Sequence, residues 1–86
     1  MTNSETTPAE RTLAQVQSGK SAVVKSVHGD GPVAKRLMEM GIVPGVKIRV
    51  VKTAPFGDPM ELRLRGYSLA LRLSEARTVE IAKEAI

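Results

Sequence analysis

The sequence predicts a mainly β fold, a small and partly open barrel of about five strands with one short helix inserted between the first two strands. From residue 46 onward most of the chain alternates apolar and polar side chains at the period of two that half-buried strands require. Glycines and prolines separate these stretches, and one stretch after residue 31 has the spacing of an amphipathic helix instead. Closing the strands into a barrel protects edges that an open sheet would expose.

The composition is that of a single small globular domain. The chain has 86 residues, of which 42% are hydrophobic and 26% are charged, so its core must be small. It contains no cysteine, which excludes disulfide bonds and thiolate metal sites. No apolar run approaches the roughly 18 residues of a membrane span, and the first residues have no signal-peptide pattern, so we expect a cytoplasmic protein. The net charge of +4 favours acidic partners.

The two ends of the chain are expected to lie outside the barrel. Residues 1–11 are polar, rich in Thr and Ser, and include Pro8, so we expect a disordered tail. The folded domain is predicted to cover residues 12–83 and to begin with a single turn that contains Leu13 and Val16. Residues 84–86 are expected to fray.

Five stretches have strand patterns, at residues 21–27, 46–51, 60–65, 68–73 and 78–82. The adjacent Val23 and Val24 interrupt the alternation of the first strand, which favours a β-bulge there. The loop at residues 53–59 contains two prolines and one glycine, which exclude regular strand pairing. Ser74 is expected to cap a single helical turn before the last strand.

The stretch from Pro32 to Met40 is predicted to form the inserted helix. Its apolar side chains fall within one arc of the helix and comprise Val33, Ala34, Leu37, Met38 and Met40. Asp30 or Gly31 can cap its start, Pro32 suits the first helical position, and Gly41 suits the left-handed residue that ends a helix. A helix this short is not stable alone in water, so the apolar arc must pack on the strands.

Three blocks of the sequence together resemble the FeoA family. They read Arg36-Leu37-x-x-Met40-Gly41-Ile42-x-Pro44-Gly45, then Ala54-Pro55-x-Gly57-Asp58-Pro59, then Leu69-Ala70-Leu71-Arg72-x-x-Glu75-Ala76. FeoA proteins are small cytosolic proteins that accompany the FeoB ferrous iron transporter. The resemblance, which runs from about Leu13 to Ala82, implies an SH3-like β-barrel. It also implies a non-enzymatic role at the cytoplasmic face of the inner membrane, through contact with the GTPase-bearing cytosolic region of a FeoB-type transporter.

Residues suited to catalysis or to metal binding are scarce. The single histidine, His28, has no evident nucleophile beside it, and no Gly-rich phosphate loop is present, so we expect neither an enzyme nor a cofactor. His28 and Asp30 supply two ligands, fewer than a ferrous site needs, and methionines suit Cu(I) better than iron. A weak metal-sensing role remains an alternative, because the SH3-like module is similar to a domain of iron-dependent repressors of the diphtheria toxin repressor type.

A basic strand face makes nucleic-acid binding a second alternative. The side chains concerned are Lys47, Arg49, Lys52, Arg63 and Arg65, with Arg72 as a further member. Proteins that bind single strands stack bases on aromatic side chains, however, and Phe56 and Tyr67 are the only aromatic residues of the chain. We therefore expect no nucleic-acid partner, and a solvated strand face is the simpler interpretation.

The expected partner site is an apolar patch on the turn after the helix and on the Pro-rich loop. Turns usually carry polar residues, so exposed apolar side chains there favour a protein partner. The predicted partner-binding residues are Met38, Ile42, Val43, Pro55, Phe56 and Asp58. Through this patch the chain is expected to be peripheral to the inner membrane by contact with its transporter partner, with weak self-association as a further option.

Overall fold

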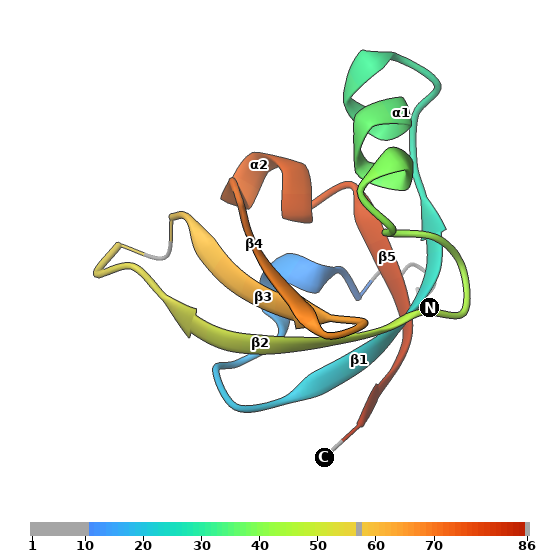
Figure 1. Ribbon diagram of the computed structural model, residues 1–86. Helices are drawn as coiled ribbons and strands as arrows, with labels where there is room; N and C mark the ends of the chain where they lie inside the picture. The colour runs from blue at the N-terminus through green and yellow to red at the C-terminus, as the bar shows by residue number, and fades with distance from the viewer. Residues whose placement is uncertain (1–10, 57, 86) are drawn as a thin grey trace, which may run out of the picture.

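The computed structural model describes residues 11–56 and 58–85 and shows one antiparallel sheet that curls on itself, with strand order β4-β3-β2-β1-β5 (Figure 1). In chain order the elements are η3 (Leu13–Gln15), β1 (Ser21–Val27), α1 (Pro32–Glu39), β2 (Lys47–Thr53), β3 (Met60–Leu64), β4 (Tyr67–Leu71), α2 (Leu73–Ala76) and β5 (Val79–Ala85). The predicted mainly β fold, with one helix between the first two strands, is confirmed. Within the described residues no helix is long and apolar enough to cross a membrane.

The core lies inside the curled sheet and draws on nearly every element. Its largest fully buried side chains are Leu13, Leu37, Ile42, Ile48, Met60, Leu62, Leu71, Val24, Val50 and Val79. Alternation places Ile48 and Val50 of β2 inside, while Lys47 and Arg49 face solvent, as the pattern predicted.

Irregular pairing bends two of the strands. The register of β1 against β5 shifts on either side of Val24, where the sequence favoured a bulge. A second shift between Val50 and Lys52 lets Lys52 face Glu61 of β3. This second irregularity matters for the site below, because it turns the side chain of Lys52 onto the outer face of the sheet.

The end of α1 is a tightly closed turn. The amide of Gly41 donates to the carbonyl of Met38 (3.0 Å), and the amide of Ile42 donates to the carbonyl of Leu37 (3.0 Å). These two bonds form a Schellman motif, in which the glycine is left-handed, and Gly41 has a φ of +99°. The hydroxyl of Tyr67, from β4, donates to the carbonyl of Met40 and so ties the end of the helix to the sheet.

The start of the last short helix needs correction, and the two predicted chain ends overlap the described residues only in part. The last short helix starts at Leu73, one residue before the predicted cap Ser74, because the carboxylate of Glu75 accepts the amide of Arg72 and starts the turn earlier. The predicted tail at residues 1–11 lies outside the described residues except for Arg11, whose carbonyl accepts the amide of Ile81 (3.0 Å). Of the residues expected to fray, 84 and 85 extend β5, because the start of β1 at Ser21 offers them a partner.

Candidate functional site

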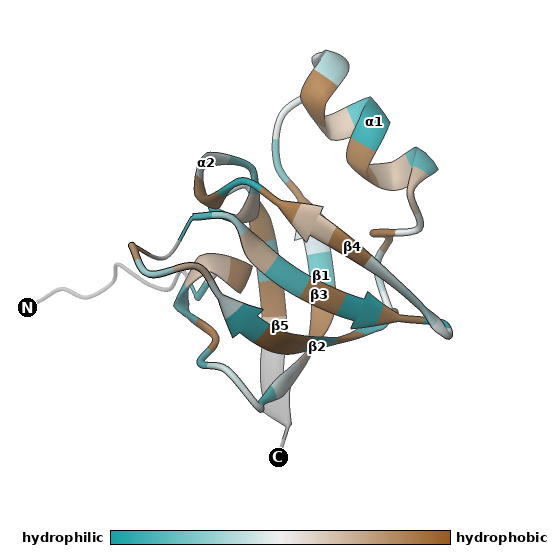
Figure 2. Ribbon diagram, turned by 60° about the vertical axis from the view of Figure 1, so that its left-hand side comes forward, coloured by the Kyte–Doolittle hydropathy of each residue, from teal (hydrophilic) through white to brown (hydrophobic). Residues whose placement is uncertain are grey.

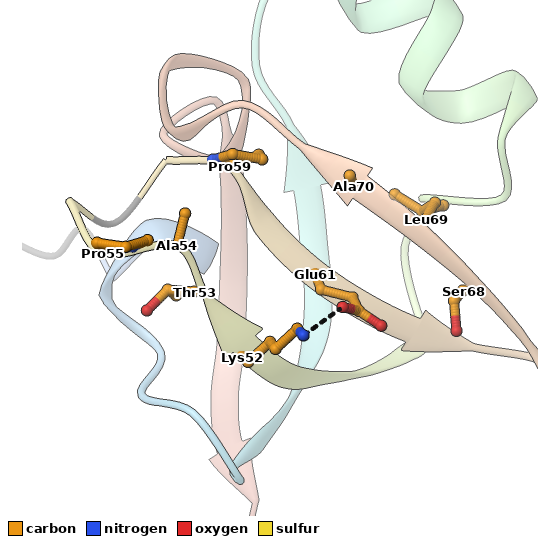
Figure 3. Close-up of a pocket in the computed structure, with 9 residues that line it drawn as sticks. All are labelled: Lys52, Thr53, Ala54, Pro55, Pro59, Glu61, Ser68, Leu69 and Ala70. Carbon is orange, nitrogen blue, oxygen red and sulfur yellow. Dashed lines mark ion pairs between the residues drawn. The ribbon is translucent and has the colours of Figure 1, made fainter.

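A shallow apolar groove lies on the outer face of the sheet, between β4 and the loop that follows β2 (Figure 3). Its volume is about 550 Å³. The residues that line it are Lys52, Thr53, Ala54, Pro55, Pro59, Glu61, Ser68, Leu69 and Ala70. Figure 3 shows the two prolines and Ala54 on the loop side and Leu69 and Ala70 on β4, with Lys52 reaching toward Glu61 between them. The exposed apolar side chains of the loop and of β4 suit contact with a protein segment.

The loop wall of the groove is held at both of its ends. The amide of Ala54 donates to the carbonyl of Pro59 (3.0 Å), which closes the loop on itself. The carboxylate of Asp58 accepts the amide of Leu73 (2.9 Å) and thereby ties the loop to the start of α2. Between these two anchors the side chain of Phe56 is 95% exposed.

The predicted partner-binding residues do not form one patch. Pro55, Phe56 and Asp58 share the loop beside the groove, whereas Met38 lies on α1 and is 43% exposed. Val43 is half-buried against the core. In Figures 1 and 2, α1 stands at one end of the molecule and the loop between β2 and β3 lies on another side.

Ile42 is wrong as a surface residue, because its side chain is fully buried. In a Schellman motif the residue after the left-handed glycine packs its side chain back onto the last turn of the helix. Ile42 occupies this position, and its backbone partner Leu37 belongs to the same buried cluster. The turn therefore carries an apolar residue for reasons of packing and not for docking.

The sequence interpretation missed the β4 wall of the groove. Strict alternation placed Leu69 inside with Leu71, and Leu69 does pack against the core, but it is only half-buried and also lines the groove. On either side of it, Ser68 and Ala70 face outward with small side chains, and Ala70 lies opposite Glu61. A pair of small outward residues beside a Pro-rich loop was the available signal, because such residues leave the face of a strand uncovered.

A basic hollow of about 280 Å³ lies on the same outer face, toward the turn between β3 and β4. Its charged residues are Lys47, Arg49, Arg63 and Arg65, with Ser21 and Leu64 completing the lining. The predicted basic strand face is therefore present, but Lys52 is set apart from it by an ion pair with Glu61 (3.9 Å). Arg72 lies beyond the other end of the groove, beside Asp58 and Pro59.

The single histidine belongs to a hydrogen-bonded cluster around Glu80 of β5. His28 Nε2 lies 2.7 Å from Glu80 Oε1, the hydroxyl of Ser26 donates to the same oxygen (3.3 Å), and Lys25 Nζ lies 3.5 Å from Oε2. The bond from His28, reinforced by the charge of Lys25, lowers the pKa of Glu80 below its ordinary value. Among residues 11–56 and 58–85, no three His, Cys, Asp or Glu side chains are grouped so as to hold a metal ion.

Comparison with known proteins identifies the family of the chain. The family model described as the FeoA domain matches residues 11–83. A curated relative from Porphyromonas gingivalis strain W83, a Fe(2+) transport protein A/Fe(2+) transporter FeoB fusion protein, is 39% identical over 69 residues. That match covers 80% of this chain but 8% of the relative, so the chain spans only a small part of its length.

Solved structures agree with the family match. The NMR structure of a FeoA-like protein from Clostridium acetobutylicum is 39% identical, with a TM-score of 0.79, and 87% of each chain is covered. FeoA of Stenotrophomonas maltophilia, crystallised in complex with zinc and described as a procaryotic SH3 domain protein, is 37% identical with a TM-score of 0.74. That match covers 83% of this chain and 88% of the other.

Proposed function

Because the chain belongs to the FeoA family, we propose that it is a non-enzymatic accessory protein of bacterial ferrous iron uptake that acts by contact with a FeoB-type transporter. The family resemblance of the three sequence blocks is confirmed, and with it the SH3-like fold. The contact is expected to involve the cytosolic, GTPase-bearing region of the transporter, which would place the chain in the cytoplasm at the membrane surface. Any GTP hydrolysis then belongs to the partner.

The observation that carries this proposal is the fusion relative from Porphyromonas gingivalis. In that protein a domain similar to this chain and an Fe(2+) transporter are one polypeptide. Because two domains in one chain are linked, their effective concentration relative to each other is of the order of millimolar, and even a weak contact between them forms. We infer that the same contact forms here between separate chains.

The groove and the exposed Phe56 are the surface best suited to this contact. The aromatic side chain of Phe56 is 95% exposed, and aromatic side chains are typical anchors of protein interfaces. Beside it, the prolines of the loop and Ala70 of β4 present apolar walls. Asp58 supports this surface by holding the loop through Leu73, and Pro55 forms part of the wall.

The proposal is tested by titrating the isotope-labelled chain with the soluble GTPase-bearing domain of the transporter and following the NMR shifts. Shifts are expected at Pro55, Phe56 and Ala70, and a dependence on bound nucleotide would identify a contact with the switch of the GTPase. Phe56→Asp should weaken binding by about 10- to 100-fold, because burying a phenylalanine side chain is worth about 1.5–3 kcal/mol. The thermal midpoint should not change, since Phe56 contributes nothing to the core.

Val33→Asp is the matched control. Val33 is 44% exposed on the first turn of α1, where an added carboxylate is compatible with the helix dipole. This variant should bind like the wild type. Met38→Asp then tests the predicted role of α1 separately. Absence of any binding, or equal losses for the variants at residues 33 and 56, would overturn the proposed contact.

A further inference from the structure

Four cationic side chains converge on one outer face of the barrel with no carboxylate among them. Lys47 and Arg49 come from β2, Arg63 from β3 and Arg65 from the turn that follows, and together they surround the basic hollow. All four residues are exposed. They are called the basic face below.

Three cations elsewhere in the described part of the chain are paired with carboxylates. Lys25 lies against Glu80, Arg36 against Glu75 and Lys52 against Glu61. No member of the basic face forms an ion pair with another side chain that the structure describes. Glu61 and Glu80, the described acidic side chains of the sheet, are engaged by cations outside the basic face.

The strand register adds a cost that an external anion would relieve. Arg49 and Arg63 are direct partners across β2 and β3, and like charges in this position destabilise a sheet. Arg65 follows at once and has a positive φ of 50°, which is uncommon for a residue with a side chain. An anionic surface that neutralised these groups together would remove the repulsion between the two strands.

The surroundings of the basic face indicate phosphate groups and not bases. Phe56 lies in the loop beyond the opposite end of β2, and the hydroxyl of Tyr67 is engaged by the carbonyl of Met40. Among the described residues no aromatic side chain lines the hollow, so nucleic-acid bases would find no stacking platform there. Clusters of four or more Lys and Arg beside a membrane are typical of binding to anionic lipids.

We propose that the basic face, Lys47, Arg49, Arg63 and Arg65, binds the anionic phospholipid headgroups of a membrane surface. The choice of a membrane rests on the proposed function, since a partner of a transporter works beside one. Glu61 lines the groove and Arg63 belongs to the basic face. Because the two residues are two positions apart on β3, their side chains point to the same side, so the groove and the basic face share one outer face of the sheet. Headgroups held by the basic face would keep the groove close to the membrane, where the cytosolic region of the transporter begins.

The test uses the full chain and lipid vesicles that contain no transporter. Sedimentation with vesicles of about 30% phosphatidylglycerol in phosphatidylcholine, in about 0.15 M salt, should carry the chain down, and pure phosphatidylcholine vesicles should not. Each cation near an anionic surface contributes about fivefold to the binding constant, so Arg49→Thr combined with Arg63→Thr should weaken binding about 25-fold. Threonine suits an exposed strand position, so thermal unfolding should show an intact fold.

Lys35→Gln combined with Arg77→Gln is the control, because it removes the same net charge from exposed positions outside the basic face. It should bind vesicles nearly as the wild type does. Three outcomes overturn the inference: no binding to phosphatidylglycerol vesicles, equal losses for the two double variants, or tighter binding to a DNA duplex, which would identify nucleic acid as the ligand. If the chain does not bind the vesicles but does bind the transporter domain in a way that depends on Phe56, this inference alone is refuted. The reverse pattern refutes the proposed function alone.

Discussion

Gly41→Ala tests how the end of α1 is tied to the sheet. Gly41 has a φ of +99°, and a Cβ at this position would lie 2.9 Å from the hydroxyl of Tyr67 and 3.7 Å from Leu64 Cδ1. A left-handed residue with a side chain costs about 1–2 kcal/mol. Moving the Tyr67 hydroxyl away also breaks its hydrogen bond to the carbonyl of Met40, worth about 1 kcal/mol. The free energy of unfolding should therefore fall by about 2–3 kcal/mol, which in a domain of this size lowers the thermal midpoint by roughly 10–20 °C.

Thermal and urea unfolding followed by circular dichroism measure this loss, with Gly45→Ala as the matched control. Gly45 has a φ of +93° but nothing within 4 Å of its added Cβ, so that variant should cost only the backbone strain of about 1–2 kcal/mol. In a Tyr67→Phe background, which lacks the hydroxyl, Gly41→Ala should cost no more than Gly45→Ala. An equal cost for the two glycines in the wild-type background, or a Gly41→Ala cost unchanged by Tyr67→Phe, would refute the role given to the hydroxyl.

Three further predictions concern the core, the pH dependence and the second helix. Ile42→Ala should lower the free energy of unfolding by about 2–5 kcal/mol in urea titrations, and unchanged stability would contradict its place in the core. The hydrogen bond from His28 holds the pKa of Glu80 below the ordinary value of 4.5, so the contribution of Glu80 to stability is present above pH 4.5 and is lost as the pH falls through the lowered pKa. Glu80→Gln should therefore flatten the decline of the thermal midpoint with acid. An unaltered decline would contradict this contribution. Glu75→Ala should cost about 1–2 kcal/mol, because it removes both the bond to the amide that starts α2 and the partner of Arg36. Arg36→Ala should cost under about 1 kcal/mol, since that side chain is 56% exposed, and equal losses of stability in calorimetry would show that the ion pair dominates instead.

Local patterns predicted the strands and the helix because each element buries one face. The alternation around Ile48 and Leu62 translates directly into an inner and an outer side, and Pro32 and Gly41 mark the helix ends through backbone geometry alone. The sequence also contains a signal for the burial of Ile42, because Ile42 follows a glycine suited to the left-handed end of a helix. A turn position is therefore not an exposed one when the end of the helix requires its side chain in the core.

The shape of the candidate site depends on strand register, which the local pattern does not contain. Val51 is the extra residue at the register shift of β2, and strict alternation would have turned Lys52 toward the core. The shift places Lys52 on the outer face opposite Glu61, which separates it from the other basic residues. The separation of Met38 from Phe56 likewise depends on where α1 and the loop lie in space, and no spacing along the chain reports that.

The Lys52–Glu61 pair divides the outer face into two parts with different physics. On one side the groove and Phe56 offer apolar surface, whose contribution to binding changes little with salt. On the other side the basic face acts through charges that are exposed and therefore screened over about 8 Å at physiological ionic strength. A partner held by the groove alone should bind almost equally at low and high salt, whereas a membrane surface held by Arg49 and Arg63 should release the chain as salt rises. The ionic-strength dependence of each interaction, measured separately, therefore identifies which half of the face carries it.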